Sequence, residues 1–428
     1  SPLLLPAAPG PPHTLPGVCG AGMLMPHPGF LLLGRHHAGT WLLALQLAIG
    51  VVLCVHAWQT FAALQARRFK PSGIDENTLM LVPWIKSPAA DDPGVEHVLQ
   101  TLRAIPGVVS VAASNQAPYG RNAWSVHAWT GSDRSPRHLT SLYLVHEGFF
   151  DTLGLSTASG RRFLADEFHD YPGDQGRLHA GPTSAIVSVA LAKHLYGDAD
   201  PLGRTLHVMP GVPLHIVGVV DRIPLPATAH GTDGAAMVLP VRLQDTAAAQ
   251  FVVRHRPDPA AMTARIRTAL SAAYPTAVSA MPVSLATLRE QTLRAPAADA
   301  WRSALACATW WLLTLGMLVL GGHRWIQEHA QEFSLRRAMG ASGAQLALRL
   351  RLEYLLLAAG ASLAALACMA WLFPLLVPGW RATAASPWTH AAAIAWTALA
   401  VQLAAGWPAR LVRRIPAHLV SRSPSVRL

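Results

Sequence analysis

The chain has 428 residues, of which 51% are hydrophobic and only 13% charged, and its formal net charge is +11. Soluble domains usually carry about a quarter charged residues, so this composition favours a membrane protein over a soluble enzyme. The basic excess lies in residues 301–428, where 12 Arg and 3 Glu give a net charge of +9, whereas residues 66–300 are close to neutral. Because the positive charge flanks apolar segments, it excludes the footprint of a nucleic-acid-binding protein.

The N-terminal stretch, residues 1–32, is rich in Pro and Gly and contains no charged residue. It has no amphipathic period, so we interpret it as disordered or as an extension that precedes the true start. The first apolar segment follows in residues 33–65. Within it, Thr40–Leu64 is long enough to cross a bilayer, which needs roughly 20 apolar residues. We therefore expect the first transmembrane helix there.

The polar region 66–300 alternates helical and strand patterns. Apolar residues recur at helical spacing before Pro106-Gly107, and a β-branched run follows directly. This alternation predicts an α+β domain and leaves open a division into two subdomains. The expected elements are a helix at Val95–Ile105, a strand at Val108–Ala112, a strand at Ala185–Val189, a helix at Ala190–Tyr196 and a strand at His215–Val220.

Metal, redox and catalytic patterns are weak in this region. None of the four cysteines lies in 66–300, which excludes a disulfide framework there. The twenty histidines include no His-Glu-x-x-His spacing, and no Gly-punctuated loop follows the acidic residues Asp166, Glu167 and Asp170. We expect no metal, no cofactor and no catalytic residue. A hydrolase in 66–300 stays open as a third interpretation.

Three further apolar segments follow. The second transmembrane helix is expected in 301–323, and the third and fourth in 352–408, joined by a short loop. Between them lies a basic loop, 324–351, and after them a basic tail, 409–428. By the positive-inside rule the loop, the tail and both termini are cytoplasmic, which places 66–300 outside.

The basic loop contains the most informative segment, which runs from Glu332 to Ser342 and reads EFSLRRAMGAS. Gly340 suits the position that closes a helix. Ser342, with Gln345 three residues later, has the pattern of a capping box that opens the next helix. Apolar Phe333, Leu335 and Met339 would dip into the membrane or a partner groove, while basic Arg336 and Arg337 meet phosphates or acidic groups.

This segment resembles the FtsX-like permease family, which includes the macrolide-exporter (MacB) type of ABC transporter. In that family it typically reads Arg-Glu-(Ile/Phe)-Gly-(Ile/Leu)-Arg-(Arg/Lys)-Ala-(Leu/Met)-Gly-Ala-(Ser/Thr), and this chain departs from it at Gln331 and Ser334. The likeness covers about residues 33–422. Its other parts, in chain order, are Ile105–Val108, Phe150–Phe163 with Gly160-Arg161, Ala190–Gly203, Val217–Val220 and Trp407–Val420.

The resemblance implies an α-helical membrane protein of the bacterial inner membrane, with four transmembrane helices in a one-plus-three arrangement. A large α+β periplasmic domain is inserted between helices 1 and 2, and the termini are cytoplasmic. It further implies a non-enzymatic permease subunit that couples ATP hydrolysis on a separate chain to motion of the periplasmic domain. The residues expected to carry the ATPase coupling are Glu332, Phe333, Arg336, Arg337, Met339 and Gly340.

The implied partners are a separate P-loop ATPase subunit, a second permease chain in a homo- or heterodimer, and the lipid bilayer. A periplasmic protein partner and the transported substrate are left open. The chain itself has no Gly-Lys-Ser/Thr motif, because none of its lysines follows a glycine. The alternative function is a membrane-anchored signalling or scaffold protein that regulates a periplasmic enzyme without an ATPase.

Side chains inside the apolar segments predict how the helices pack. Small residues at four-residue spacing on the third helix, Gly360, Ala364 and Cys368, suit close helix–helix approach. Polar residues in the spans, among them Gln402, are expected to form hydrogen bonds between helices.

Overall fold

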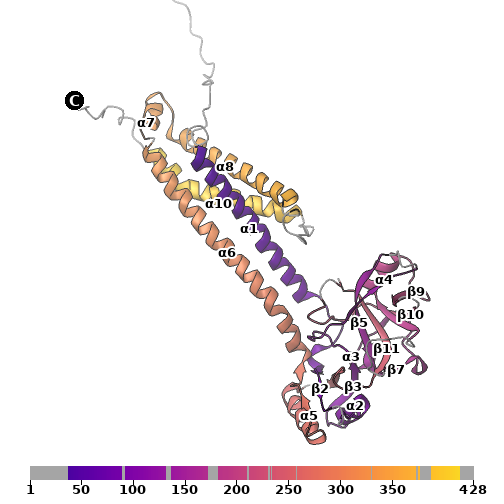
Figure 1. The fold of residues 1–428 in the computed structure, drawn as a ribbon. Helices are drawn as coiled ribbons and strands as arrows, with labels where there is room; N and C mark the ends of the chain where they lie inside the picture. The colour runs from indigo at the N-terminus through magenta and orange to yellow at the C-terminus, as the bar shows by residue number, and fades with distance from the viewer. Residues whose placement is uncertain are drawn as a thin grey trace, which may run out of the picture. The chain divides into compact units, whose positions relative to one another are not determined.

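The computed structural model describes residues 37–88, 92–131, 136–171, 182–209, 212–229, 232, 234–256, 258–328, 330–372, 375 and 387–414. The chain forms two compact units (Figure 1). The helical unit draws on the described parts of Ser1–His56 and Ala306–Leu428, and the sheet unit comprises Ala57–Leu305. The predicted segments 1–32 and 415–428, and most of the loop between the third and fourth spans, lie outside the described residues.

Within the described residues, four helices are long and apolar enough to cross a membrane, which confirms that part of the expected architecture. Their bounds are α1 His37–Phe69, α6 Leu285–Glu328, α8 Gly343–Ala367 with a π-helical turn Cys368–Leu372, and α10 Pro387–Arg414. A short helix, α7, occupies Ala330–Ala338 between α6 and α8.

Two helices extend beyond the predicted membrane spans. The second span was expected in 301–323, and α6 begins earlier, at Leu285, because Leu285 and Leu288 are buried in the core of the sheet unit. The tail was expected from 409, and α10 continues into it through Pro408 to Arg414. A Cβ built on Gly322 of α6 would lie 3.1 Å from Cγ of Pro408, so α10 packs closely at the proline. Tertiary contact therefore carries the helix past a residue that usually ends one.

The helical unit is held by aromatic and polar contacts between its helices. Nε1 of Trp310 in α6 donates to the backbone oxygen of Gln46 in α1 at 2.9 Å. Nε2 of Gln402 in α10 donates to the backbone oxygen of Arg351 in α8 at 3.0 Å, as the polar residue in that span predicted. The apolar core around them includes Leu47, Trp311 and Tyr354.

The small-residue stripe on α8 does not pack inside this chain. Gly360 and Ala364 are exposed, Cys368 is half-buried, and a Cβ on Gly360 would meet no atom within 4 Å. The small residues that do face neighbouring helices are offset by about 100° around α8, since each helical residue turns by that angle. They are Ala358, Ala361, Ser362 and Ala365. Close packing of the stripe of Gly360, Ala364 and Cys368 against another helix therefore stays a prediction.

The sheet unit is built on a twelve-stranded mixed sheet whose main path is β14-β1-β12-β3-β5-β11-β8-β10-β6. Strands β4, β7 and β9 pair with β5, β11 and β10, and β2 pairs with β13 in a separate ribbon. The strands are β1 Leu79–Val82, β2 Ile85–Lys86, β3 Val108–Ser114, β4 Ser125–Ala128, β5 His138–Val145, β6 Thr157–Gly160, β7 His169–Tyr171, β8 Ser184–Ser188, β9 Thr205–Met209, β10 Val212–Val220, β11 Ala236–Leu243, β12 Gln250–His255, β13 Val278–Ser279 and β14 Val283–Ser284.

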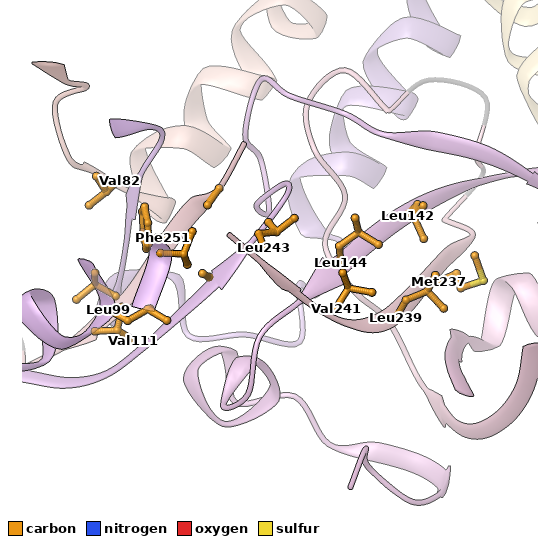
Figure 2. Close-up of a cluster of buried hydrophobic side chains, with 14 of the residues drawn as sticks. Val82, Leu99, Val111, Leu142, Leu144, Met237, Leu239, Val241, Leu243 and Phe251 are labelled. Atoms are coloured by element: carbon orange, nitrogen blue, oxygen red, sulfur yellow. The ribbon is translucent and has the colours of Figure 1, made fainter. Parts of the chain in front are cut away.

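Both faces of the sheet are buried, because successive side chains along each strand point to opposite faces. In β5, Leu142 and Leu144 join one apolar core, while Tyr143 and Val145 join the other. Figure 2 shows the first core, which Phe251 and several strands share. This face is covered by α2 Val95–Arg103, α4 Val189–Tyr196 and α5 Pro259–Ala273, and the other by α3 Phe149–Leu153 and the start of α6.

The predicted elements of the middle region are confirmed. The helix α2 buries Val95, Val98, Leu99 and Leu102, which are the residues whose spacing predicted it. The strands β3, β8 and β10 and the helix α4 lie where the sequence patterns placed them. Residues 57–305 form one compact unit on one main sheet, so the division into two subdomains that the sequence left open is not seen.

Strands β6 and β10 approach each other unusually closely. Gly160 has φ +76°, and a Cβ there would lie 2.4 Å from the backbone oxygen of Val217 and 2.8 Å from Cα of Gly218. A Cβ on Gly218 would lie 2.4 Å from the backbone oxygen of Arg161. Glycine is the residue that both positions accept, since any side chain would overlap backbone atoms.

A half-buried carboxylate fixes the segment that follows β6. Glu167 accepts hydrogen bonds from Arg161 Nη1 at 2.6 Å, Arg161 Nη2 at 2.8 Å and Ser184 Oγ at 2.6 Å, and from Leu164 N at 2.7 Å. The hydrogen bond from Arg161 holds the pKa of Glu167 at about 2, below its usual value of 4.5. The Glu167 side chain is 15% exposed, so this is a structural ion pair within the fold.

We expect Glu167→Gln to lower the free energy of unfolding at pH 7 by about 1–3 kcal/mol, because it removes a charge-assisted network. In the wild-type chain the carboxylate contributes fully above pH 4.5. That contribution is lost as the pH falls towards 2, because the unfolded state takes up the proton first. Unfolding followed at pH 7 and pH 3 checks this. The difference between the two proteins should shrink at pH 3, and Asp166→Asn, at the exposed neighbour, should behave as wild type at both.

Candidate coupling surface

Helix α7 is attached to the helical unit by its inner face. Phe333 is 2% exposed, and its ring packs edge-on against Trp325 of α6 with ring centres 5.5 Å apart. Ser334 is fully buried, and its Oγ donates to the backbone oxygen of Gln331 at 2.8 Å. The expectation that Phe333 enters the membrane or a partner groove is therefore wrong. Its aromatic ring serves as the internal anchor of α7.

The outer face of α7 carries large apolar side chains. Leu335 is 49% exposed and Met339 is 61% exposed. Met339 directly follows α7, and its N donates to the backbone oxygen of Leu335 at 3.0 Å, so positions 332, 335, 336 and 339 keep helical spacing and share one side. The backbone of α7 is described at these positions, whereas the side chains of Glu332, Arg336 and Arg337 lie outside what the structure describes. The surface defined by these four positions is called the α7 outer face below.

The turn after α7 has the geometry that its sequence predicted. Gly340 has φ +100°, which only glycine adopts without strain. Ser342 then caps α8: its Oγ accepts from Gln345 N at 3.2 Å, and Gln345 Oε1 accepts from Ser342 N at 3.0 Å. This reciprocal pair is the capping box, and it fixes where α8 begins.

The base of α8 contains an acidic residue that sequence reasoning missed. Glu353 is 4% exposed, and its Oε1 accepts from Arg349 Nε, one helical turn earlier, at 3.3 Å. A carboxylate in an apolar span is costly unless it is paired, which was the available signal. Nearby, a Cβ on Gly343 would lie 3.2 Å from Cα of Arg413 in α10. The α7–α8 turn is thus packed directly against the end of α10.

The described part of this arrangement is a short helix followed by a glycine turn. Among the residues that the structure describes, no group of three or more His, Cys, Asp or Glu side chains is placed to hold a metal ion. What the site presents is a short helix, held by an aromatic contact to α6, with an apolar outer face beside basic positions.

Comparison with known proteins adds two family matches. A MacB-like periplasmic core domain matches residues 40–281, and an FtsX-like permease C-terminal domain matches residues 305–417. No curated protein matches the chain.

Among solved structures, the extracellular domain of the noncanonic ABC-type transporter YknZ from Gram-positive bacteria is 17% identical. The matched region covers 47% of this chain and 98% of the YknZ domain, with a TM-score of 0.32. The periplasmic region of MacB from Actinobacillus actinomycetemcomitans is 16% identical, covers 52% and 95%, and has a TM-score of 0.34. A domain of a permease protein from Porphyromonas gingivalis is 17% identical, covers 49% and 92%, and has a TM-score of 0.31.

Proposed function

Because this chain belongs to the FtsX-like permease family with a MacB-like periplasmic core domain, we propose that it couples ATP hydrolysis on a separate chain to motion of its sheet unit. The family and the four apolar helices indicate a bacterial membrane protein with a periplasmic domain. Permeases of this family generally partner with an ATPase. In this proposal the chain is the non-enzymatic membrane subunit, and two such chains pair around the ATPase dimer.

The observation that carries the proposal is the two-sided character of α7. Its inner face is fixed to α6 through Phe333 and Trp325, while Leu335 and Met339 on the outer face have no cover from the described residues. A force applied to the outer face therefore reaches α6 through a packed aromatic contact, since packed side chains transmit displacement. The Gly340 turn and the Ser342 cap fix where α7 meets α8.

Helix α6 supplies the onward connection in this mechanism. It is continuous from Leu285 to Glu328, and its first residues Leu285 and Leu288 are part of the apolar core of the sheet unit. Motion of the α6 end near Trp325 would thus displace the strands that pack on Leu285. Substrate need not pass between the helices, which agrees with the small number of charged residues in the four spans.

Co-purification with a P-loop ATPase tests the proposal. The tagged full-length chain is extracted in mild detergent from its own host, and bound proteins are identified by mass spectrometry and assayed for ATP hydrolysis. We expect the wild-type chain to retain a P-loop ATPase. We expect the double variant Leu335→Glu/Met339→Glu to retain at least tenfold less ATPase than the wild-type chain, because two carboxylates would be buried at the contact.

Two further variants make the result specific. Arg336→Glu tests the basic positions of the same face and should also weaken retention. Val278→Glu, at a side chain 63% exposed in the sheet unit, is the matched control and should retain the ATPase fully. If the folded wild-type chain brings down no ATPase, the coupling proposal fails and the ATPase-independent scaffold function takes its place. If Leu335→Glu/Met339→Glu retains it, the contact lies elsewhere.

A further inference from the structure

The sheet unit contains a cavity of about 390 Å³ whose lining is basic on one side and apolar on the other. Among the residues that the structure describes, four cationic side chains line it and no Asp or Glu does. The cations come from three separate segments: the end of α1, the loop after β10, and the start of α6. They are Arg67, Lys70, Arg222 and Arg289.

One of these cations is already neutralised. Arg289 Nη1 lies 3.0 Å from both carboxylate oxygens of Glu76, and its Nη2 donates to the backbone oxygens of Arg68 at 3.1 Å and Lys70 at 2.8 Å. Arg289 therefore serves to tie α6 to the end of α1. Its bonds hold the backbone at Arg68 and Lys70 in place beside the cavity.

The other three cations have no acidic partner in the part of the chain that the structure describes. Among the described residues, no carboxylate lies within ion-pair distance of Arg67, Lys70 or Arg222, and all three are exposed. Arg222 Nη1 donates to the backbone oxygen of Pro71 at 2.7 Å, which leaves its other N–H groups for a ligand. Arg222 also lines an adjoining cavity of about 240 Å³, together with Asp221. The described lining of the larger cavity thus carries a net positive charge.

The apolar wall of the cavity is rigid. It is formed by the segment Ile223–Pro226, whose backbone is held by two hydrogen bonds from the core. Tyr143 Oη donates to the backbone oxygen of Pro224 at 2.7 Å, and Tyr119 N donates to that of Leu225 at 3.1 Å. The prolines and these hydrogen bonds fix the wall before any ligand arrives. Binding therefore costs little conformational entropy in this segment.

Exposed aromatic side chains place this cavity near a membrane surface. Within the sheet unit, Trp58 and Phe61 of α1 and Trp301 of α6 are 56%, 49% and 73% exposed. A 2.8 Å hydrogen bond joins the hydroxyls of Thr60 in α1 and Ser303 in α6. The exposed aromatic side chains of the two helices therefore lie at the same level along them. Aromatic residues gather at the edge of the hydrocarbon layer. Arg67 follows Phe61 by six residues, about 9 Å along a helix, which places it at the outer side of a headgroup layer about 5–8 Å deep.

We propose that this cavity binds the phosphate of an anionic amphiphile, with Arg67, Lys70 and Arg222 as its cationic partners. The phosphate supplies the negative charge that the described lining lacks. The glycerol and first methylene groups of the amphiphile lie against Pro224 and Pro226. The membrane level of the cavity favours a phospholipid headgroup as the source. The inference requires only that α1 and α6 enter a bilayer, so it stands or falls independently of ATPase coupling.

Binding of short-chain lipids to the purified full-length chain in non-ionic detergent tests the proposal. Dioctanoyl phosphatidylglycerol, dioctanoyl phosphatidylcholine and inorganic phosphate are titrated separately, and binding is measured by calorimetry. We expect phosphatidylglycerol to bind at least tenfold more tightly than phosphatidylcholine, whose choline offsets the phosphate charge. This preference should fall as salt is raised. Competition by inorganic phosphate at millimolar concentration would identify free phosphate compounds as the source for the same site.

Variants decide whether the named cations are responsible. Lys70→Gln/Arg222→Gln should abolish the preference, and Arg67→Gln alone, whose side chain makes no hydrogen bond within the described residues, should weaken it without affecting the fold. Arg267→Gln, at an exposed arginine of α5 away from the cavity, is the matched control and should bind as wild type. Equal affinity for the two lipids, or an unchanged preference in folded Lys70→Gln/Arg222→Gln, overturns the proposal.

Discussion

Replacing Gly160 by alanine is expected to lower the free energy of unfolding of the sheet unit by about 3–5 kcal/mol, which is a large share of the stability of an ordinary domain. Two costs add. The backbone at Gly160 has φ +76°, which costs a residue with a side chain about 1 kcal/mol or more. The new Cβ would also lie 2.4 Å from the backbone oxygen of Val217, and β6, which ends the main path of the sheet, would have to break its hydrogen bonds to β10 to make room.

The chain offers a control that separates these two costs. Gly148 has φ +77°, nearly the same as Gly160, but a Cβ there would meet no atom within 4 Å. Gly148→Ala should therefore show the backbone cost alone, about 1 kcal/mol. Thermal unfolding of the two variants, together with protease resistance of the sheet unit, measures the stability loss of each. Equal stability of the two variants would show that β6 and β10 can separate freely, which contradicts the contact described here.

Replacing Phe333 by alanine is expected to release α7 from the helical unit. Phe333 is 2% exposed and packs against Trp325, so truncation removes a fully buried ring and leaves a cavity. The cost is about 3–5 kcal/mol, of the same order as the stability of a whole domain. Because α7 has only nine residues, it cannot remain helical without this contact. If α7 receives the force from an ATPase, transport coupled to ATP should fall at least tenfold.

Leu335→Ala is the matched control on the same helix. Its side chain is 49% exposed, so truncation should change the free energy of unfolding by less than about 1 kcal/mol. Hydrogen exchange of the α7 backbone reports the structural effect directly. Protection in α7 should disappear in Phe333→Ala and persist in Leu335→Ala. Full protection in Phe333→Ala would show that the Trp325 contact does not hold the helix.

Local sequence patterns predicted the elements of the sheet unit well. The spacing of Val95, Val98, Leu99 and Leu102 predicted α2, and the confirmed helix buries these four side chains. The turn glycine at position 340 and the capping box that begins at Ser342 were likewise predicted, because both depend only on neighbouring residues. Such features are decided within a few residues of the chain.

Features that depend on distant residues were missed or misplaced. From the sequence, Phe333 was predicted to face outward, because the pattern of a basic helix does not indicate that Trp325 is the partner of Phe333. The start of α6 at Leu285 was missed because residues 285–300 are not apolar enough to belong to a span, and only the sheet core buries Leu285 and Leu288. The basic cavity joins Lys70, Arg222 and Arg289, which are far apart in the chain.

The sequence by itself determined the class of the molecule: apolar segments of bilayer length, a neutral α+β region between the first two, and the segment that indicates its family. Composition and periodicity suffice for these because burial in lipid or in a core imposes a repeating chemical pattern on the chain. Tertiary structure alone decided which side of α7 faces inward, which face of α8 packs, and why Gly160 must lie against β10. These are set by close contacts between elements distant in sequence, and no local pattern records such contacts.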